Sequence, residues 1–262
     1  MSLRDTFDQA PELYDRVRPG YPEAAFDDLV TLAGLGAGSR VLEIGCGTGQ
    51  ATVPLARRGL EVTAVELGSG LAEVARRNVA PYPAVVVVNA AFEDWAPPQE
   101  FDAVVAATSF HWLDSAVRLE KIDEALRPGG LLATIATRHI AGGTAQFFED
   151  VQRCYETWMP GTGPDERLPD AADVPYTDRD ELERSGRFAS IVVRRYEREL
   201  TYTTNEYREL LQSYSGHRAL APDSRERLLA CIGELMDNRF DGQIAKRYLT
   251  EMTVAQTRRI TA

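Results

Sequence analysis

Short runs of apolar residues alternate with amphipathic stretches through the first half of the chain. The runs that we expect to form strands are Val41–Ile44, Val62–Val65, Ala84–Val88, Phe101–Ala107 and Leu131–Ala136. The stretches between them that we expect to form helices are Gln50–Arg58, Ser69–Asn78 and Ser115–Leu126. Continuous apolar runs of this length are typical of strands buried on both faces. The alternation therefore predicts an α/β fold with a doubly wound, mostly parallel sheet, in which the carboxyl ends of the strands share the edge where ligands bind.

The pattern changes on both sides of this alternation. Residues 1–30 indicate one or two helices interrupted at Arg18–Pro22, and we expect them to form a helical cap. Thr144–Trp158 has a helical pattern and precedes a segment rich in Pro, Gly and Asp, Pro160–Pro175. Because a long irregular segment inside a compact domain is often a lid, we interpret residues 140–225 as an insertion that covers a substrate.

Two further strands are expected late in the chain, at Ser190–Thr203 and Ile244–Thr257. They bring the sheet to seven strands with an antiparallel edge, within a single domain of residues 1–262. Arg127–Gly130 predicts a turn before the fifth strand, because Pro ends a helix and Gly tolerates a positive φ angle. A helix from Pro222 to about Asn238 is expected to have Asp223 as its N-cap.

The most informative stretch is Val41–Gln50, in which a buried strand leads through Gly45, Gly47 and Gly49 into a helix. Glycine lets backbone N–H groups approach a ligand closely, and a helix N-terminus favours anionic groups. The spacing Gly-x-Gly-x-Gly differs from the dinucleotide pattern Gly-x-Gly-x-x-Gly, whose last position is Gln50 here. A tight strand–helix turn with no ligand is the alternative interpretation.

Two carboxylates accompany this loop. Glu43 lies inside the buried strand, where a carboxylate is costly unless it is paired, and the ammonium group of a cofactor would pair with it. Glu66 ends the second strand, about 20 residues after the loop, where a carboxylate accepts hydrogen bonds from both ribose hydroxyls. For Glu66 the alternative is stabilisation by a helix N-terminus. Both features suit any adenosine-containing cofactor, so a nicotinamide-dependent oxidoreductase stays open at this point.

Together these residues resemble motif I of the class I S-adenosylmethionine-dependent methyltransferases, in which an acidic strand residue precedes Gly-x-Gly-x-Gly. Asn89–Trp95 resembles the adenine-contact motif of this family, except that Ala91 stands where a carboxylate is common. Phe7–Pro22 and Ser109–Asp114 are similar to segments of its small-molecule branch, the trans-aconitate methyltransferase-like (type 11) methyltransferases. The resemblance implies a Rossmann-like fold, S-adenosyl-L-methionine as the cofactor and methyl transfer to a small molecule.

The resemblance also implies a set of cofactor-binding residues near the carboxyl ends of the strands. The set is Tyr14, Arg18, Glu43, Gly45, Cys46, Gly47, Thr48, Gly49, Glu66, Leu67, Phe92, Glu93 and Thr108. Phe92 would pack on the adenine ring, and Arg18, with Tyr14 one helical turn before it, would pair with the cofactor's carboxylate. A solvated position before Pro19 is the alternative for Arg18. Cys46 is interpreted as a small residue that fits the loop rather than as a nucleophile.

His111, after the fourth strand, is the candidate catalytic base. A neutral His takes a proton from a hydroxyl or an amine; alternatively, His111 and Trp112 line the pocket, because a carboxylate acceptor needs no base. Arg138 and His139 follow the fifth strand, where they would bind an acidic acceptor or form a surface ion pair. The expected reaction is therefore O-methylation of a carboxylate or hydroxyl, with a non-catalytic cofactor-binding module as the remaining alternative.

The numbers of charged residues and histidines bear on whether the protein binds nucleic acid or a metal ion. The chain has 29 Lys and Arg residues against 40 Asp and Glu residues, a net charge of −11 that argues against general nucleic-acid binding. The 3 histidines are dispersed and give no metal motif. The lysines are Lys121 and Lys246 alone, an arginine bias that we attribute to a GC-rich bacterial genome.

The cysteines Cys46, Cys154 and Cys231 form an odd and scattered set. Such a set predicts neither a disulfide framework nor a zinc site, and it fits a reducing compartment. The amino terminus has no apolar signal segment, and the longest aliphatic run, Ala84–Val88, is too short to cross a membrane. We therefore expect a cytoplasmic enzyme without nucleic-acid or membrane partners, as a monomer or homodimer.

Overall fold

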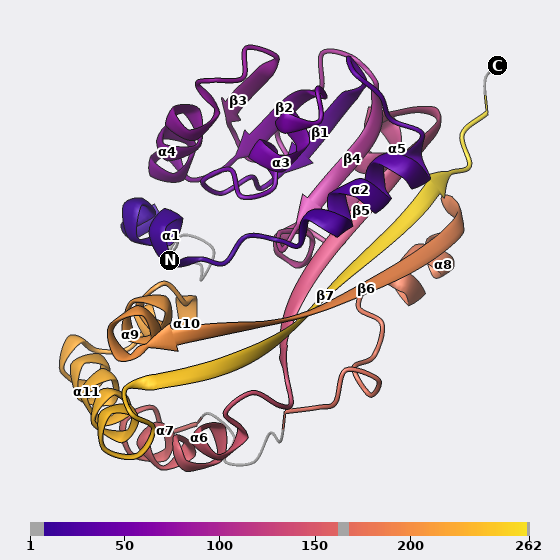
Figure 1. Ribbon diagram of the computed structural model, residues 1–262. Helices are drawn as coiled ribbons and strands as arrows, with labels where there is room; N and C mark the ends of the chain where they lie inside the picture. Colours follow the sequence, from indigo (N-terminus) through magenta and orange to yellow (C-terminus); the bar gives the residue numbers. More distant parts are fainter. Residues whose placement is uncertain (1–7, 162–167, 261–262) are drawn as a thin grey trace. The chain divides into compact units, whose positions relative to one another are not determined.

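A seven-stranded sheet organises the chain (Figure 1). The computed structural model describes residues 8–161 and 168–260. The strands are β1 (Arg40–Ile44), β2 (Glu61–Glu66), β3 (Val85–Asn89), β4 (Phe101–Ala107), β5 (Leu126–Ile140), β6 (Phe188–Thr203) and β7 (Gln243–Thr257). Their order in the sheet is β3-β2-β1-β4-β5-β7-β6. Parallel pairing joins β1 to β2 and β4, β2 to β3, and β4 to β5. The predicted α/β class with a doubly wound, mostly parallel sheet is confirmed.

The described residues fall into two compact units, which we call the sheet unit and the helical unit. The sheet unit comprises the described part of residues 20–137, 175–196 and 250–262. The helical unit comprises the described part of residues 1–19, 138–174 and 197–249. Strands β5 and β6 pass from the sheet unit into the helical unit, and β7 passes back. β7 therefore runs against its two neighbours, which confirms the antiparallel element but places β6 at the outer edge.

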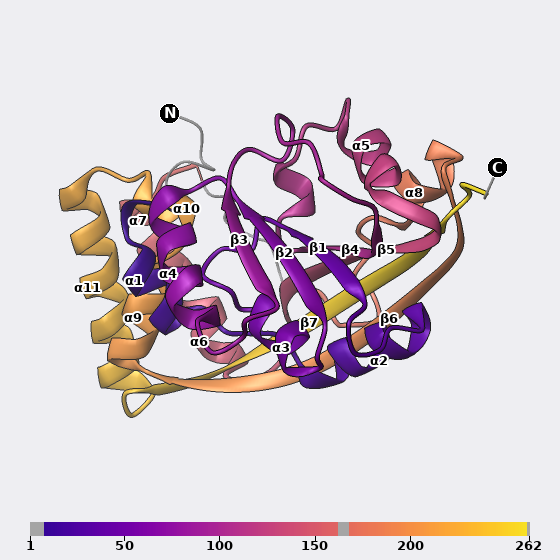
Figure 2. The same ribbon diagram turned by 90° about the horizontal axis from the view of Figure 1, so that it is seen from above.

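Helices cover both faces of the sheet in the sheet unit (Figure 2). They are α2 (Glu23–Ala33), α3 (Thr52–Arg57), α4 (Ser69–Val79), α5 (Arg118–Ala125) and α8 (Arg179–Ser185), with a 3-10 turn at Phe110–Trp112. Val41 packs in one buried apolar cluster with residues of α2 and α3, whereas its neighbour Leu42 packs in a second cluster with residues of α5 and α8. Successive residues of a strand point to opposite faces, which explains why most positions of the central strands are apolar.

The helical unit has its own apolar core. Its helices are α1 (Pro11–Val17), α6 (Ala145–Asp150), α7 (Gln152–Trp158), α9 (Thr204–Gln212), α10 (Ser215–Arg218) and α11 (Pro222–Arg239). Fully buried members of this core include Phe147, Leu210, Leu228 and Ile232. Burial at this spacing on α9 and α11 follows the helical repeat of the apolar positions.

A disulfide joins α7 to α11 in this unit. Cys154 and Cys231 are bonded, with their Cα atoms 5.9 Å apart and a sequence separation of 77. The prediction that the cysteines form no disulfide is therefore wrong. Because the expected reducing compartment was inferred from that prediction, the cysteines no longer support it. The pairing brings together two helices that are distant along the chain, which spacing alone does not reveal.

Two predictions about local structure are wrong in detail, and a third falls partly outside the described residues. The Arg127–Gly130 turn is a bulge within β5, since Phe101 pairs with Leu126 and Ala103 pairs with Leu131. Gly129 does have the expected positive φ, at 73°. Ala221, not Asp223, is the N-cap of α11, because Pro222 occupies the first helical turn. Of the proposed loop Pro160–Pro175, residues 162–167 lie outside the described residues.

Candidate functional site

The glycine loop between β1 and α3 has a backbone that glycine alone adopts easily. Gly45, Gly47 and Gly49 have φ angles of 71°, 59° and 100°, in the region that side chains disfavour. A Cβ atom on Gly45 would lie 2.6 Å from the Cβ atom of Ser109, which follows β4. The Gly45 N–H donates a hydrogen bond of 2.8 Å to the carbonyl oxygen of Val65 on β2. The loop therefore lies against the carboxyl ends of β1, β2 and β4.

Glu66, at the end of β2, holds this loop in place. One carboxylate oxygen accepts the Gly47 N–H at 2.8 Å, and the other accepts the Gly68 N–H at 2.8 Å. The Asn89 amide donates to the carbonyl oxygens of Glu66 and Leu67, both at 2.9 Å. Leu67 itself is partly exposed. A carboxylate oxygen accepts more than one hydrogen bond, so these amide contacts are compatible with hydrogen bonds from a diol.

Glu43 lies beneath the loop and is fully buried. Its carboxyl group accepts a hydrogen bond of 2.6 Å from the Thr52 hydroxyl. Burial raises the pKa of Glu43 to about 8, and the neighbouring Glu66 charge adds to the increase, whereas the Thr52 hydrogen bond opposes it. The group is therefore mainly protonated at neutral pH in this state. Thr52 is the partner that the sequence did not identify.

The remaining loop residues support the backbone. Cys46 is buried, and burial together with the nearby carboxyl groups raises the pKa of its thiol well above the ordinary range. Such a thiol is a poor nucleophile, as the sequence indicated. Thr48 is buried, its hydroxyl accepts the Gln50 amide at 2.6 Å, and its carbonyl oxygen accepts the Asn78 amide at 2.9 Å. Gln50 therefore supports the loop.

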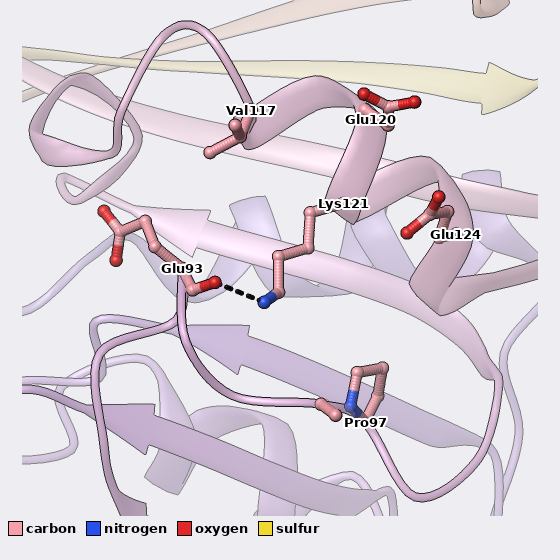
Figure 3. Close-up of a pocket in the computed structure, with 7 residues that line it drawn as sticks. Glu93, Pro97, Val117, Glu120, Lys121 and Glu124 are labelled. Atoms are coloured by element: carbon pink, nitrogen blue, oxygen red, sulfur yellow. Dashed lines mark hydrogen bonds between the residues drawn. The ribbon is translucent and has the colours of Figure 1, made fainter.

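Phe92 and Glu93 follow β3. The Phe92 ring is buried in the core of the sheet unit, and the Lys121 ammonium lies 5.5 Å from its centroid. Lys121 donates a hydrogen bond of 2.6 Å to the carbonyl oxygen of Glu93, at a surface hollow of about 370 Å³ (Figure 3). The Glu93 carboxylate accepts the Asp114 N–H at 3.3 Å. Since the Phe92 side chain packs in the core, its backbone N–H is the better candidate for an adenine contact.

Thr108 and His111 follow β4. Thr108 has a φ angle of 56°, and its hydroxyl accepts a hydrogen bond of 2.9 Å from Tyr21. His111 is exposed in the 3-10 turn, with its ring centroid 4.9 Å from that of Trp112. Arg118 fixes the turn by donating to the Phe110 carbonyl oxygen at 2.9 Å. Because this turn begins beside Gly45, the structure brings His111 to the same edge of the sheet as the glycine loop.

Tyr14 and Arg18 belong to the helical unit. The Arg18 guanidinium lies 5.1 Å from the Tyr14 ring centroid and 4.4 Å from that of Tyr214. It donates a hydrogen bond of 2.8 Å to the carbonyl oxygen of Ser213. Arg18 is thus partly buried among aromatic rings, not simply solvated as in the alternative interpretation.

The helical unit also contains a cavity of about 790 Å³ that the sequence did not predict. His139, Tyr214, His217 and Lys246 line it, whereas Arg138 is exposed and outside its lining. Lys246 was missed because β7 carries several other polar residues, such as Arg247 and Glu251, so nothing local marks Lys246 as buried. Among residues 8–161 and 168–260, no group of three His, Cys, Asp or Glu side chains is suited to a metal ion. Over the same residues, every helix is too short or too polar to cross a membrane.

Comparison with known proteins agrees with this geometry. Residues 41–130 match the model of a methyltransferase domain family. An uncharacterised methyltransferase of Mycobacterium tuberculosis is 36% identical over 135 residues, covering 52% of this chain and 52% of the relative. A trans-aconitate 2-methyltransferase of Rhodopseudomonas palustris is 34% identical over 109 residues, covering 40% of this chain and 41% of the relative. The chain thus spans about half the length of the curated relatives that match it best among these.

A solved structure extends the likeness in fold to nearly the whole chain. The putative type II methyltransferase of Anaeromyxobacter dehalogenans superimposes with a TM-score of 0.62 at 24% identity, covering 94% of this chain and 99% of that one. The sheet order, the glycine loop and the carboxylate at the end of β2 define an α/β domain for an adenosine-containing cofactor. Residues 41–130 therefore carry a methyltransferase domain of the class I, S-adenosylmethionine-dependent type.

Proposed function

We propose that the protein transfers the methyl group of S-adenosylmethionine to an oxygen atom of a small molecule, either a carboxylate or a hydroxyl. The observation that carries the proposal is the glycine loop, with Glu43 buried beneath it and Glu66 hydrogen-bonded to it. The curated trans-aconitate 2-methyltransferases among the relatives support an oxygen acceptor. The proposal includes a cytoplasmic enzyme without nucleic-acid partners, with residues 1–30 as a cap and 140–225 as a lid.

The residues around the loop fit this cofactor. Gly45 leaves no room for a side chain, because a Cβ atom there would overlap Ser109, so glycine is needed for this loop conformation. Glu66 has the position and the acceptor atoms for ribose hydroxyls. Glu43 is a buried carboxyl group that an ammonium group would convert to its charged form. Further contacts with the adenosine part of the cofactor would come from Leu67, Phe92, Glu93 and Thr108.

S-adenosylmethionine supplies a methyl group on a positively charged sulfur, which makes the methyl carbon electrophilic. The protein's own task is to hold the acceptor oxygen in line with that carbon and to exclude water, because alignment supplies most of the rate gain in such a transfer. His111, at the edge of the sheet beside the loop, would take the proton from a hydroxyl acceptor. With a carboxylate acceptor, His111 would serve only as part of the pocket wall.

Calorimetric titration of the full chain with S-adenosylhomocysteine, NAD and NADP tests the cofactor assignment. We expect saturable binding of S-adenosylhomocysteine and no binding of either nicotinamide cofactor. Incubation with S-adenosylmethionine and a metabolite panel, read as formation of S-adenosylhomocysteine, tests catalysis. Tight cofactor binding without turnover on any oxygen nucleophile would favour a binding module over an enzyme.

Replacing Glu66 with Ala should weaken S-adenosylhomocysteine binding by about 1–3 kcal/mol, because charged hydrogen bonds to the ribose are lost. The loop would also lose the acceptor of the Gly47 N–H. Glu61→Ala is the matched control, since Glu61 is an exposed carboxylate at the other end of the same strand. Calorimetry on both variants checks this prediction. Equal affinity in the Glu66 and Glu61 variants would remove Glu66 from the site.

The effect of His111→Ala depends on the acceptor. With a hydroxyl acceptor, loss of the general base should lower kcat by roughly 10²–10⁴-fold, and high pH should restore part of the rate. With a carboxylate acceptor, the change should be mild and independent of pH, since no proton is removed. The pH profile of kcat for this variant and the wild type decides between the two. A severe loss that high pH leaves unchanged would contradict the role of base.

A further inference from the structure

The cavity of the helical unit contains a buried positive charge. Lys246, on β7, lines the cavity and is only 6% exposed. Its ammonium lies 5.9, 5.5 and 5.2 Å from the ring centroids of Tyr207, Tyr214 and Tyr248. Its one described hydrogen bond is a long one, 3.5 Å to the Tyr214 hydroxyl. Among residues 8–161 and 168–260, no carboxylate forms an ion pair with it.

The other titratable groups deep in the cavity do not compensate this charge. Burial lowers the pKa of His139 to about 3 and that of His217 to about 4, and in both the Lys246 charge adds to the decrease. Both imidazoles are therefore neutral at pH 7. His217 contacts the Tyr155 hydroxyl at 3.1 Å, whereas the buried His139 Nε2 atom has no hydrogen-bond partner. Burying the Lys246 ammonium without an ion pair, and the His139 Nε2 atom without a hydrogen bond, costs free energy of folding, unless a ligand forms hydrogen bonds with them.

The charged groups at the rim are solvated. Glu149, Arg153 and Glu156 also line the cavity, but all three are exposed. Exposed charges of both signs interact weakly with a buried group, because water screens them. Phe148, Leu211 and the tyrosine rings supply apolar wall. The cavity volume of about 790 Å³ lies within the range of small-molecule sites.

We propose that this cavity binds a small molecule with one carboxylate on an apolar or aromatic body, and that the Lys246 ammonium is the partner of that carboxylate. The Tyr214 hydroxyl and the His139 Nε2 atom, protonated in the appropriate tautomer, are further donors. A single cation matches a single negative charge, whereas a phosphate or polycarboxylate would bring excess charge into an apolar site. The inference concerns a site inside the helical unit and does not depend on methyl transfer.

Lysine-selective labelling tests the proposal directly, because the chain contains only two lysines. The full chain is labelled with ¹³C at the lysine ε carbon, and Lys121→Arg assigns the two signals. Benzoate, phenylacetate and indole-3-acetate are titrated without S-adenosylmethionine, with indole-3-acetamide and inorganic phosphate as comparisons. We expect at least one carboxylate to shift the Lys246 signal saturably while the Lys121 signal stays in place. The amide should bind at least roughly tenfold more weakly than its acid.

Substitution of Lys246 provides the second measurement. Lys246→Met keeps the length and packing of the side chain but removes the charge, and it should weaken binding of the best carboxylate roughly 10–100-fold. Lys246→Arg should retain binding within a few-fold. If the Met variant does not fold, the titration of the wild type and the Arg variant decides.

Several outcomes would overturn the proposal. They are no binding of any of the three carboxylates at millimolar concentration, equal affinity for acid and amide, phosphate binding tighter than all three acids, or a shift of the Lys121 signal alone. Unchanged affinity in a folded Lys246→Met variant would also overturn it. Because the readout is binding without cofactor, a failure here leaves the methyltransferase assignment untouched, and a failure of cofactor binding leaves this result untouched.

Discussion

Gly45→Ala is expected to lower the affinity for S-adenosylhomocysteine by more than roughly 100-fold, the largest effect of any single substitution at the glycine loop. A side chain at a φ angle of 71° is strained, and its Cβ atom would lie 2.6 Å from the Cβ atom of Ser109. Together strain and overlap cost about 2–5 kcal/mol. The loop can relieve them only by moving away from β4, which would disturb the Gly47 contact with Glu66 and with it the proposed cofactor site. Calorimetry measures the affinity, and circular dichroism establishes that the variant is folded.

Two further variants separate the overlap from a general effect of alanine. Gly36→Ala is the matched control, because nothing lies within 4 Å of the added Cβ atom at that position. It should bind the ligand as the wild type does. Ser109→Gly in the Gly45→Ala background removes the atom that is overlapped, and should recover part of the affinity. Wild-type affinity in the Gly45→Ala variant would contradict the close packing of this loop against β4.

Reduction of the disulfide is expected to lower the free energy of unfolding by about 3–4 kcal/mol. The bond closes a loop with a sequence separation of 77 residues, so its loss frees a long segment in the unfolded chain. It joins α7 to α11, whose residues share the core of the helical unit. Thermal unfolding with and without dithiothreitol measures the effect. The transition of the helical unit should move to lower temperature.

The variant with Cys154→Ser and Cys231→Ser isolates the contribution of this bond. It should unfold at low temperature with or without dithiothreitol, as the reduced wild type does. Cys46 is a free thiol in both proteins, so its reduction state does not distinguish them. A wild type whose unfolding temperature is insensitive to dithiothreitol, while the thiols become titratable, would show that the bond adds no stability.

The sheet and its ligand edge could be predicted from sequence because their signals are local. Buried strands leave apolar runs such as Phe101–Ala107, which the structure reproduces with the same limits. The three glycines of the loop predict a backbone conformation that other residues avoid. The structure has positive φ angles at Gly45, Gly47 and Gly49. Glu43 and Glu66 stood out because carboxylates are rare within or beside such strands.

The features that were missed depend on contacts between distant segments. Cys154 and Cys231 gave no pairing signal, since only the packing of α7 on α11 brings them together. Lys246 is one of several polar residues along β7, so nothing local marked it as buried. Its tyrosine neighbours come from α9, the turn after α9 and β7 itself. Asp223 was a reasonable N-cap by residue type, but Pro222 shifts the helix start by its fixed φ angle.

One continuous segment, the connection between β6 and β7, supplies part of the cavity wall. Residues 204–242, between these strands, supply Tyr207, Leu211, Tyr214 and His217, whereas Lys246 belongs to β7. Grafting this segment from a relative would exchange the apolar wall and leave the ammonium in place. Because the wall and the ammonium come from separate segments, substitutions within residues 204–242 would change the shape and polarity of the cavity without removing the charge of Lys246 or altering the glycine loop.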